Sequence, residues 1–269
     1  MPYLAVEESA RTEPRYCEYL APASVAQYVV CTWVGQPRSG DVYADTVFPD
    51  GCTDIIWDGR EPIVAGPDTA PVGLCRDATT TYVGIRFRPG TGPVLLGTPA
   101  PEIVDARPLL VELWNGDAAE LAGRLGACST EDETRAALVR AVRLRLEHAP
   151  APDQRMATLV AILSAPRPPS LSRIADRLAL SERQLHRRCL AAFGYGAKTL
   201  QRILRFQRFL AVARARPTQE LARLAAACGF ADQAHLSREC MRLGGRTPRA
   251  LLGSRDDVRF VQDDPPVVL

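Results

Sequence analysis

Hydrophobic positions divide the chain into a strand-like first part and a helix-like second part. Over about the first hundred residues, short β-branched or aromatic runs end at Gly, Pro or Asp, as strands closed by turns do. The runs are VVCTWV, TVFPDG, CTDIIWDG, EPIVAG and TTYVGIRFRPG. Several strands at such close spacing predict an antiparallel barrel or sandwich.

The apolar period becomes helical from about Pro108 to Glu147, and again from Met156 to Leu252. Between these stretches, HAPAPDQ at 148–154 has the composition of a linker. We therefore predict an α+β protein in three parts: an antiparallel β-barrel domain with flanking helices at 1–150, an all-α domain at 151–255, and a disordered tail at 256–269.

The segment that begins at Ser170 has the pattern of a helix-turn-helix. Its first helix places four apolar residues on one face at i, i+3, i+4 and i+7: Leu171, Ile174, Ala175 and Leu178. After about three residues Ser181 and Gln184 are spaced as a capping box, which predicts the start of a second helix. Gly194 is suited to end that helix in a left-handed conformation.

The same pattern recurs about 50 residues later. Leu221, Leu224, Ala225 and Cys228 form a second apolar stripe. Gly229 follows where a tight turn needs a left-handed residue, and Asp232 is a good N-cap for the next helix. Between the two motifs, YGAKTLQRILRFQRFLAVARAR predicts one long helix. The all-α domain is thus expected to hold two helix-turn-helix motifs joined by a long helix.

Charge is distributed unevenly between the parts. The whole chain has a formal net charge of +2. Residues 151–255 hold 19 Lys and Arg against 6 Asp and Glu, whereas residues 1–150 hold 13 against 21. A compact, strongly basic segment is typical of a protein that binds a polyanion, and the helix-turn-helix pattern identifies that polyanion as duplex DNA.

Polar residues on the outward faces of the two second helices are the candidate DNA contacts. A stiff helix between the motifs could hold them about one DNA turn apart, ~34 Å, so that both enter successive major grooves. We predict base contacts by Arg183, His186, Arg187, Gln233, His235 and Arg238. We predict phosphate contacts by Arg202, Arg205, Ser237 and Arg242.

The segment from Pro168 to Leu252 resembles the DNA-binding domain of AraC-type (AraC/XylS family) transcription regulators. The resemblance is most specific in CGFADQAHLSRECMRLGGRTPRALL, which resembles the family's second motif and contains its closing Gly-x-Thr-Pro at residues 245–248. The stretch IADRLALSERQLHRRC resembles the first motif. It implies that positions around the six predicted base contacts reach bases. The chain departs from the family pattern at Cys240, where Phe is usual, and at Ala234, which has no hydrogen-bonding side chain.

The N-terminal part resembles an uncharacterised, cupin-like domain found on some AraC-type regulators. The resemblance rests on FPDGCTDIIWDG, VAGPDT and GIRFRPGTGPVLLG. It implies a small-molecule effector site, a homodimer interface, or both; the helices at 116–147 could pair between copies or pack on the barrel. No histidine precedes His148, so a His-ligated metal is not expected. Candidate pocket residues are Asp50, Asp54, Trp57, Arg86 and Arg88.

The sequence also limits other functions. The early acidic residues and the lack of a long apolar run argue against a secretory signal or membrane helix, so a cytoplasmic location is expected, with RNA polymerase as a further partner. The eight cysteines include no Cys-x-x-Cys pair. We expect a sequence-specific regulator with no cofactor and no enzymatic activity. A DNA-repair alkyl acceptor and a non-specific DNA-binding protein are the alternatives.

Overall fold

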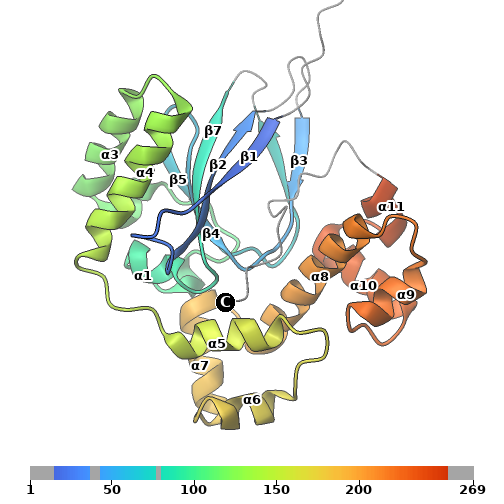
Figure 1. Cartoon of the computed structure of the whole chain (residues 1–269). Helices are drawn as coiled ribbons and strands as arrows, with labels where there is room; N and C mark the ends of the chain where they lie inside the picture. Colours follow the sequence, from blue (N-terminus) through green and yellow to red (C-terminus); the bar gives the residue numbers. More distant parts are fainter. Residues whose placement is uncertain (1–14, 37–42, 77–79, 254–269) are drawn as a thin grey trace, which may run out of the picture.

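The computed structural model describes residues 15–36, 43–76 and 80–253 (Figure 1). The predicted tail at 256–269 lies outside these residues. The strands are β1 (Arg15–Leu20), β2 (Val29–Gln36), β3 (Tyr43–Val47), β4 (Thr53–Trp57), β5 (Pro62–Ala65), β6 (Val72–Arg76) and β7 (Tyr82–Phe87). The first helices are α1 (Gly92–Leu96), the 3-10 helix η1 (Ala100–Glu102), α2 (Leu110–Trp114), α3 (Gly116–Gly126) and α4 (Glu131–Leu146). We call this part, β1 to α4, the sheet half.

The described strands form two antiparallel sheets. The larger has the order β1-β2-β7-β4-β5, and β3 pairs with β6 in the smaller one. Figure 1 shows α3 and α4 covering one face of the larger sheet, with β3 beyond its other face. The α+β class is confirmed. The strands β1 and β6 are additional to those that the sequence predicted.

Alternation along the strands gives the larger sheet two different faces. Val83, Ile85 and Phe87 of β7 are buried in the apolar core beneath α3 and α4. Gly84 and Arg86 lie between them in sequence and point to the other face. A Cβ at Gly84 would overlap the indole ring of Trp33 on β2, so this glycine makes room for the indole. The second face therefore holds large and polar side chains.

The rest of the described chain, the helical half, contains α5 (Gln154–Leu163), α6 (Leu171–Arg177), α7 (Glu182–Phe193), α8 (Ala197–Ala215), α9 (Leu221–Ala227), α10 (Gln233–Gly244) and α11 (Pro248–Gly253). The pairs α6–α7 and α9–α10 are the two predicted motifs, and α8 is the long helix between them. Gly194 and Gly229 have φ of +77° and +81°, as the sequence predicted. Among the described residues, no helix is both long and apolar enough to cross a membrane.

The two halves meet along the end of α7 and the side of α8. Phe48, which follows β3, is buried in the core of the helical half. The side-chain amide of Gln207 in α8 donates a 2.6 Å hydrogen bond to the Pro49 carbonyl oxygen. A Cβ at Gly194 would overlap Val104, which follows η1, so the sheet half packs directly against the end of α7. The joint therefore places the first helix-turn-helix relative to the sheets.

Candidate nucleic-acid interface

Local sequence fixes which face of α7 is exposed. The backbone N–H of Gln184 donates to Ser181 Oγ at 3.2 Å, and that of Ser181 donates to Gln184 Oε1 at 2.8 Å, which confirms the predicted capping box. Leu185, Cys189 and Phe193 are buried. With this face turned into the core, the polar residues between them face solvent.

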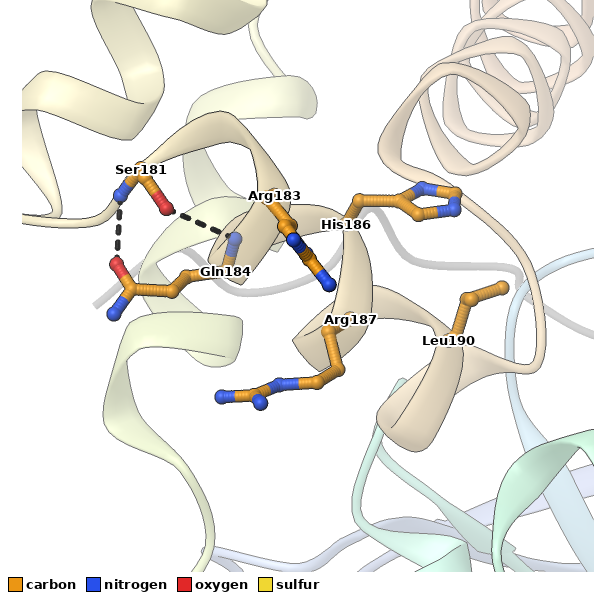
Figure 2. Close-up of a pocket in the computed structure, with 6 residues that line it drawn as sticks. All are labelled: Ser181, Arg183, Gln184, His186, Arg187 and Leu190. Atoms are coloured by element: carbon orange, nitrogen blue, oxygen red, sulfur yellow. Dashed lines mark hydrogen bonds between the residues drawn. The ribbon is translucent and has the colours of Figure 1, made fainter.

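Arg183, His186 and Arg187 lie together on that exposed face of α7. Figure 2 shows them leaving neighbouring turns of the helix, with His186 directed away from the two arginines. The three side chains have no hydrogen bond or ion pair within the described part of the chain, and all are exposed. A hollow of about 690 Å³ is lined by Ser181, Arg183, Gln184, His186, Arg187 and Leu190. This face of α7 can therefore accept an external anion or polar edge.

In the corresponding helix of the second motif, α10, only two of the three predicted base contacts are free side chains. Gln233, Arg238 and Arg242 are exposed. His235 instead turns back toward its own helix start: its Nδ1 accepts a 3.3 Å hydrogen bond from the Ala231 N–H. Its ring also stands edge-on to Phe230 at 5.4 Å. The predicted base contact by His235 would require this arrangement to open.

Ser237 lies in the middle of α10, and its hydroxyl donates to the Gln233 carbonyl oxygen at 2.9 Å. Such a bond to the preceding turn is common for serine within a helix. The hydroxyl proton of Ser237 is therefore engaged inside the helix, and only the lone pairs of its Oγ remain available to an external group.

Two arginines of α8 that were predicted to contact phosphates interact inside the protein. Arg202 donates from Nε and Nη2 to both carboxylate oxygens of Glu239 in α10, at 2.7 and 2.6 Å. Arg205 stands over the ring of Phe230, with its guanidinium carbon 5.5 Å from the ring centroid. Burial lowers the pKa of Arg205. The α8 surface thus contributes to the packing of the second motif.

The predicted pocket residues of the sheet half separate onto different faces. Asp50, Asp54 and Arg86 come together on the second face of the larger sheet. Trp57 lies in the apolar core on the opposite face, because it is three residues from Asp54 on β4 and therefore of opposite parity. Arg88 donates from Nε to the Ala26 carbonyl oxygen at 2.7 Å. The five residues do not line one cavity.

Arg86 is the centre of a buried charged cluster. Its Nε and Nη2 donate to the two carboxylate oxygens of Asp54 at 3.0 and 2.8 Å, and its Nη1 donates to Glu18 at 3.2 Å. Trp33 Nε1 donates to Asp54 at 2.9 Å. Burial opposes the charge of Arg86, but Asp54 and Asp50 outweigh it and raise the pKa of the guanidinium. Burial raises the pKa of Asp50, although Arg86 acts against it.

Sequence reasoning missed Glu18 and Trp33 as members of this cluster. For Trp33 the available signal was the small residue Gly84 within an otherwise bulky strand, which indicates close approach of a large side chain. The partner of Gly84 follows from the register of β2 and β7, in which Trp33 lies opposite Gly84. That register depends on pairing between residues about 50 positions apart.

The cysteines of the helical half are buried thiols. Burial raises the pKa of Cys189 to about 11 and that of Cys240 to about 12. Within the described residues, no group of three His, Cys, Asp or Glu is placed to hold a metal ion. Neither thiol has the environment that lowers a cysteine pKa for nucleophilic attack.

Two family models match the chain. Residues 174–254 match a helix-turn-helix domain, and residues 17–108 match a domain of unknown function, DUF6597. No curated protein matches. Among solved structures, ToxT from Vibrio cholerae O395 is similar with a TM-score of 0.44 and 12% identity, over 78% of this chain and 94% of that one. The unsaturated fatty acid bound ToxT from V. cholerae strain SCE256 gives 0.39 and 11%, over 89% and 93%.

Proposed function

We propose that the chain is a DNA-binding transcription regulator whose AraC-type helix-turn-helix domain reads two short elements on one face of duplex DNA. In this proposal α7 enters one major groove and α10 enters the next. The 19 residues of α8 extend about 28 Å at 1.5 Å per residue, close to the ~34 Å of one DNA turn. A single copy could therefore reach both elements.

The observation that carries the proposal is the free cationic face of α7. Arg183 and Arg187 have no anionic partner in the described residues, and exposed arginines can pair bidentately with O6 and N7 of guanine. His186 beside them can donate to or accept from base edges or phosphates. We assign base reading in the first element to these three residues.

In this proposal fewer side chains contact bases in the second element than in the first. Gln233 and Arg238 are the exposed candidates on α10, and Arg242 further along is placed for a phosphate. Ala234 contributes only a methyl group, and His235 is held by Ala231 and Phe230. We therefore expect most of the sequence preference to reside in the first element.

We also propose a regulatory role for the sheet half. Its buried Arg86 cluster is a polar interior of the kind that a small polar effector could rearrange, and the turn containing Asp50 lies next to the joint with α8. A homodimer, contact with RNA polymerase and a cytoplasmic location remain parts of the proposal. Asp50, Asp54 and Arg86 are the effector-site candidates that lie together.

The test is selection of binding sites from random duplex DNA by the full-length protein at near-physiological salt, followed by single substitutions. We expect an enriched site with two elements about 10 base pairs apart. Arg187→Ala should relax the preference at one base pair of the first element, by about 1–3 kcal/mol. Arg167→Ala is the matched control, because Arg167 is exposed but precedes α6 and lies off the α7 face. Equal effects of the two changes would contradict the proposal.

Two measurements separate the alternatives from this proposal: the same selection and an assay for methyl transfer. A non-specific DNA-binding protein would enrich no sequence, and its specificity ratio would stay near one. An alkyl-acceptor enzyme would need a reactive thiolate, and the raised pKa values of Cys189 and Cys240 disfavour one at those positions. Transfer of a methyl group from alkylated DNA to any cysteine would favour the enzyme instead.

A further inference from the structure

The two recognition helices share one register. Their N-caps, Ser181 and Asp232, are 51 residues apart. Their left-handed C-caps, Gly194 and Gly245, are also 51 residues apart. Each position of α7 therefore has a defined counterpart in α10, and differences between counterparts can be compared directly.

In this register Arg188 of α7 corresponds to Glu239 of α10, and each forms an ion pair with an earlier helix. Arg188 pairs with Asp153, the N-cap of α5. Glu239 pairs with Arg202 of α8. Since α5 and α8 are the helices that precede the two motifs, the same position ties each recognition helix to the helix before its own motif. The charges are reversed between the two pairs.

We propose that Arg202 and Glu239 are positioning residues that set the orientation of α10 for its DNA element. The inference rests on the proposed function and deepens it, because it assigns Arg202 to the internal geometry of the second motif instead of to a phosphate. Neither residue needs to contact a base.

The ion pair between Arg202 and Glu239 depends on the relative orientation of α8 and α10, whereas apolar packing depends on it much less. Arg202 uses two parallel donors on the two oxygens of one carboxylate, at 2.7 and 2.6 Å, which fixes both distance and angle. Apolar packing also joins α8 and α10, as between Phe206 and Gly244. Apolar burial is non-directional and tolerates small rotations of a helix about its own axis. This bidentate ion pair, which we call the fork, therefore favours one rotation of α10 about its own axis.

Because the pair is largely buried, removing only one of its two partners is costly. The Glu239 side chain is 9% exposed and that of Arg202 is 23% exposed. Burial alone would raise the pKa of Glu239, but the hydrogen bonds and charge of Arg202 outweigh it, and the pKa is lowered. The hydrogen bonds to Glu239 raise the pKa of Arg202 against the effect of burial. Both partners thus stay charged and engaged at neutral pH.

A positioning role and a phosphate-contact role predict opposite effects for Glu239→Gln. If Arg202 contacted a phosphate, removing the nearby carboxylate would free the guanidinium and strengthen DNA binding at every sequence. If the pair orients α10, Glu239→Gln weakens the fork, and the preference for the second element falls. The sign of the change therefore separates the two roles.

The experiment uses the full-length protein and a duplex carrying the two-element site that the wild-type protein selects. Binding is measured to this duplex and to duplexes with either element scrambled, at several salt concentrations. We expect Glu239→Gln and Arg202→Gln each to lower the preference for the intact second element by about tenfold. The first-element preference and the salt slope should stay unchanged. The double variant should lose no more than either single variant, because the two residues act as one unit.

Glu220→Gln is the matched control. It also removes one carboxylate from the second motif, but Glu220 belongs to an exposed pair with Arg223 at 3.9 Å. We expect no loss of second-element preference for this variant. A loss as large as that of Glu239→Gln would overturn the inference.

Three other outcomes would also overturn it. One is stronger binding by Glu239→Gln together with a salt slope that falls by about one unit in Arg202→Gln, as a phosphate contact requires. The second is a parallel loss of both elements, which would indicate a general loss of folding. The third is that the wild-type protein reads both elements but the Glu239→Gln and Arg202→Gln variants keep its full preference for the second element. That result would defeat this inference and leave the proposed function standing. A wild-type protein that selects no site would defeat the proposed function, and this inference with it.

Discussion

The ring of Phe48 stands edge-on to that of Phe206, with 5.7 Å between their centroids and 85° between their planes. Phe48 belongs to the sheet half and Phe206 to α8, so this contact joins the two halves of the molecule. The hydrogen bond from Gln207 to the Pro49 carbonyl oxygen lies beside it. Because this apolar contact and hydrogen bond join the two halves, we expect the halves to unfold cooperatively.

Phe48→Ala should weaken this joint. Loss of a buried phenyl ring costs about 3 kcal/mol or more, and here the loss falls on the contact between halves. We expect the wild-type protein to unfold in a single denaturant transition and the variant to unfold in two. Far-UV circular dichroism and tryptophan fluorescence can follow it, since the three tryptophans, at positions 33, 57 and 114, lie in the sheet half. Phe48→Leu is the control, because leucine keeps most of the apolar volume of the side chain. Two transitions in this variant as well would mean that apolar volume is not what couples the halves.

The turns of the two motifs predict opposite responses to exchanging Ala and Gly. Ala179 has a φ of +52°, a left-handed conformation that costs a side-chain-bearing residue about 1 kcal/mol. Ala179→Gly should therefore stabilise the protein by up to about that amount. Gly229→Ala should destabilise it by more, because a Cβ there would overlap the Pro166 carbonyl oxygen. Thermal unfolding of the two variants checks both signs, and a stabilised Gly229→Ala would refute the account.

These turns show what the sequence can predict. The caps at Ser181, Gly194 and Asp232 depend on residues within one or two turns of helix, so their pattern is visible along the chain. The left-handed Gly229 follows from the same local reasoning. The equivalent position in the first motif holds Ala179, which no local signal marks as left-handed. Its turn is closed by a hydrogen bond from the Leu180 N–H to the Ala175 carbonyl oxygen at 3.0 Å, as the Phe230 N–H bonds to Ala225 around Gly229.

The chemistry of the charged residues was harder to predict, because it depends on partners distant in sequence. Arg202 and Glu239 are 37 residues apart, and Arg86 and Glu18 are 68 apart. Helical period places Arg202 on the surface of α8, but it does not reveal that a carboxylate of α10 meets it there. Trp57 is a different case, because it lies three residues from Asp54 in a run already predicted to be a strand, and alternation alone places the two side chains on opposite faces.

Arg86→Gln should strongly destabilise the sheet half at neutral pH. The change leaves Asp54, Asp50 and Glu18 without their shared cation in a buried site, where breaking one side of an ion pair costs about 3–5 kcal/mol. Arg88→Gln is the matched control, because Arg88 bonds to a carbonyl oxygen, and its loss should cost about 1 kcal/mol. Chemical denaturation at pH 7 compares them. Equal losses would mean that the charge of Arg86 is not what the cluster requires.

The Arg202–Glu239 pair predicts a pH dependence of stability. The pKa of Glu239 in the folded protein lies below its ordinary value of 4.5, so ionised Glu239 stabilises the folded state above that pH. This contribution is lost as the pH falls through the lowered folded-state pKa. The difference in unfolding free energy between the wild-type protein and Glu239→Gln should therefore be constant near neutral pH and shrink below about pH 4.5. Urea denaturation from pH 3 to 7 measures it; a difference that grows in acid would contradict the assignment.

The contact of Val104 with Gly194 limits how freely the two halves can be exchanged during evolution. No side chain fits at Gly194 while Val104 occupies its place, and Gly194 ends the first recognition helix. A recombination that joined this helical half to a foreign sheet half within 147–153 would preserve the linker but present an unmatched surface to that helix end. The two halves are therefore expected to be inherited as a pair, with changes at positions 104 and 194 occurring together.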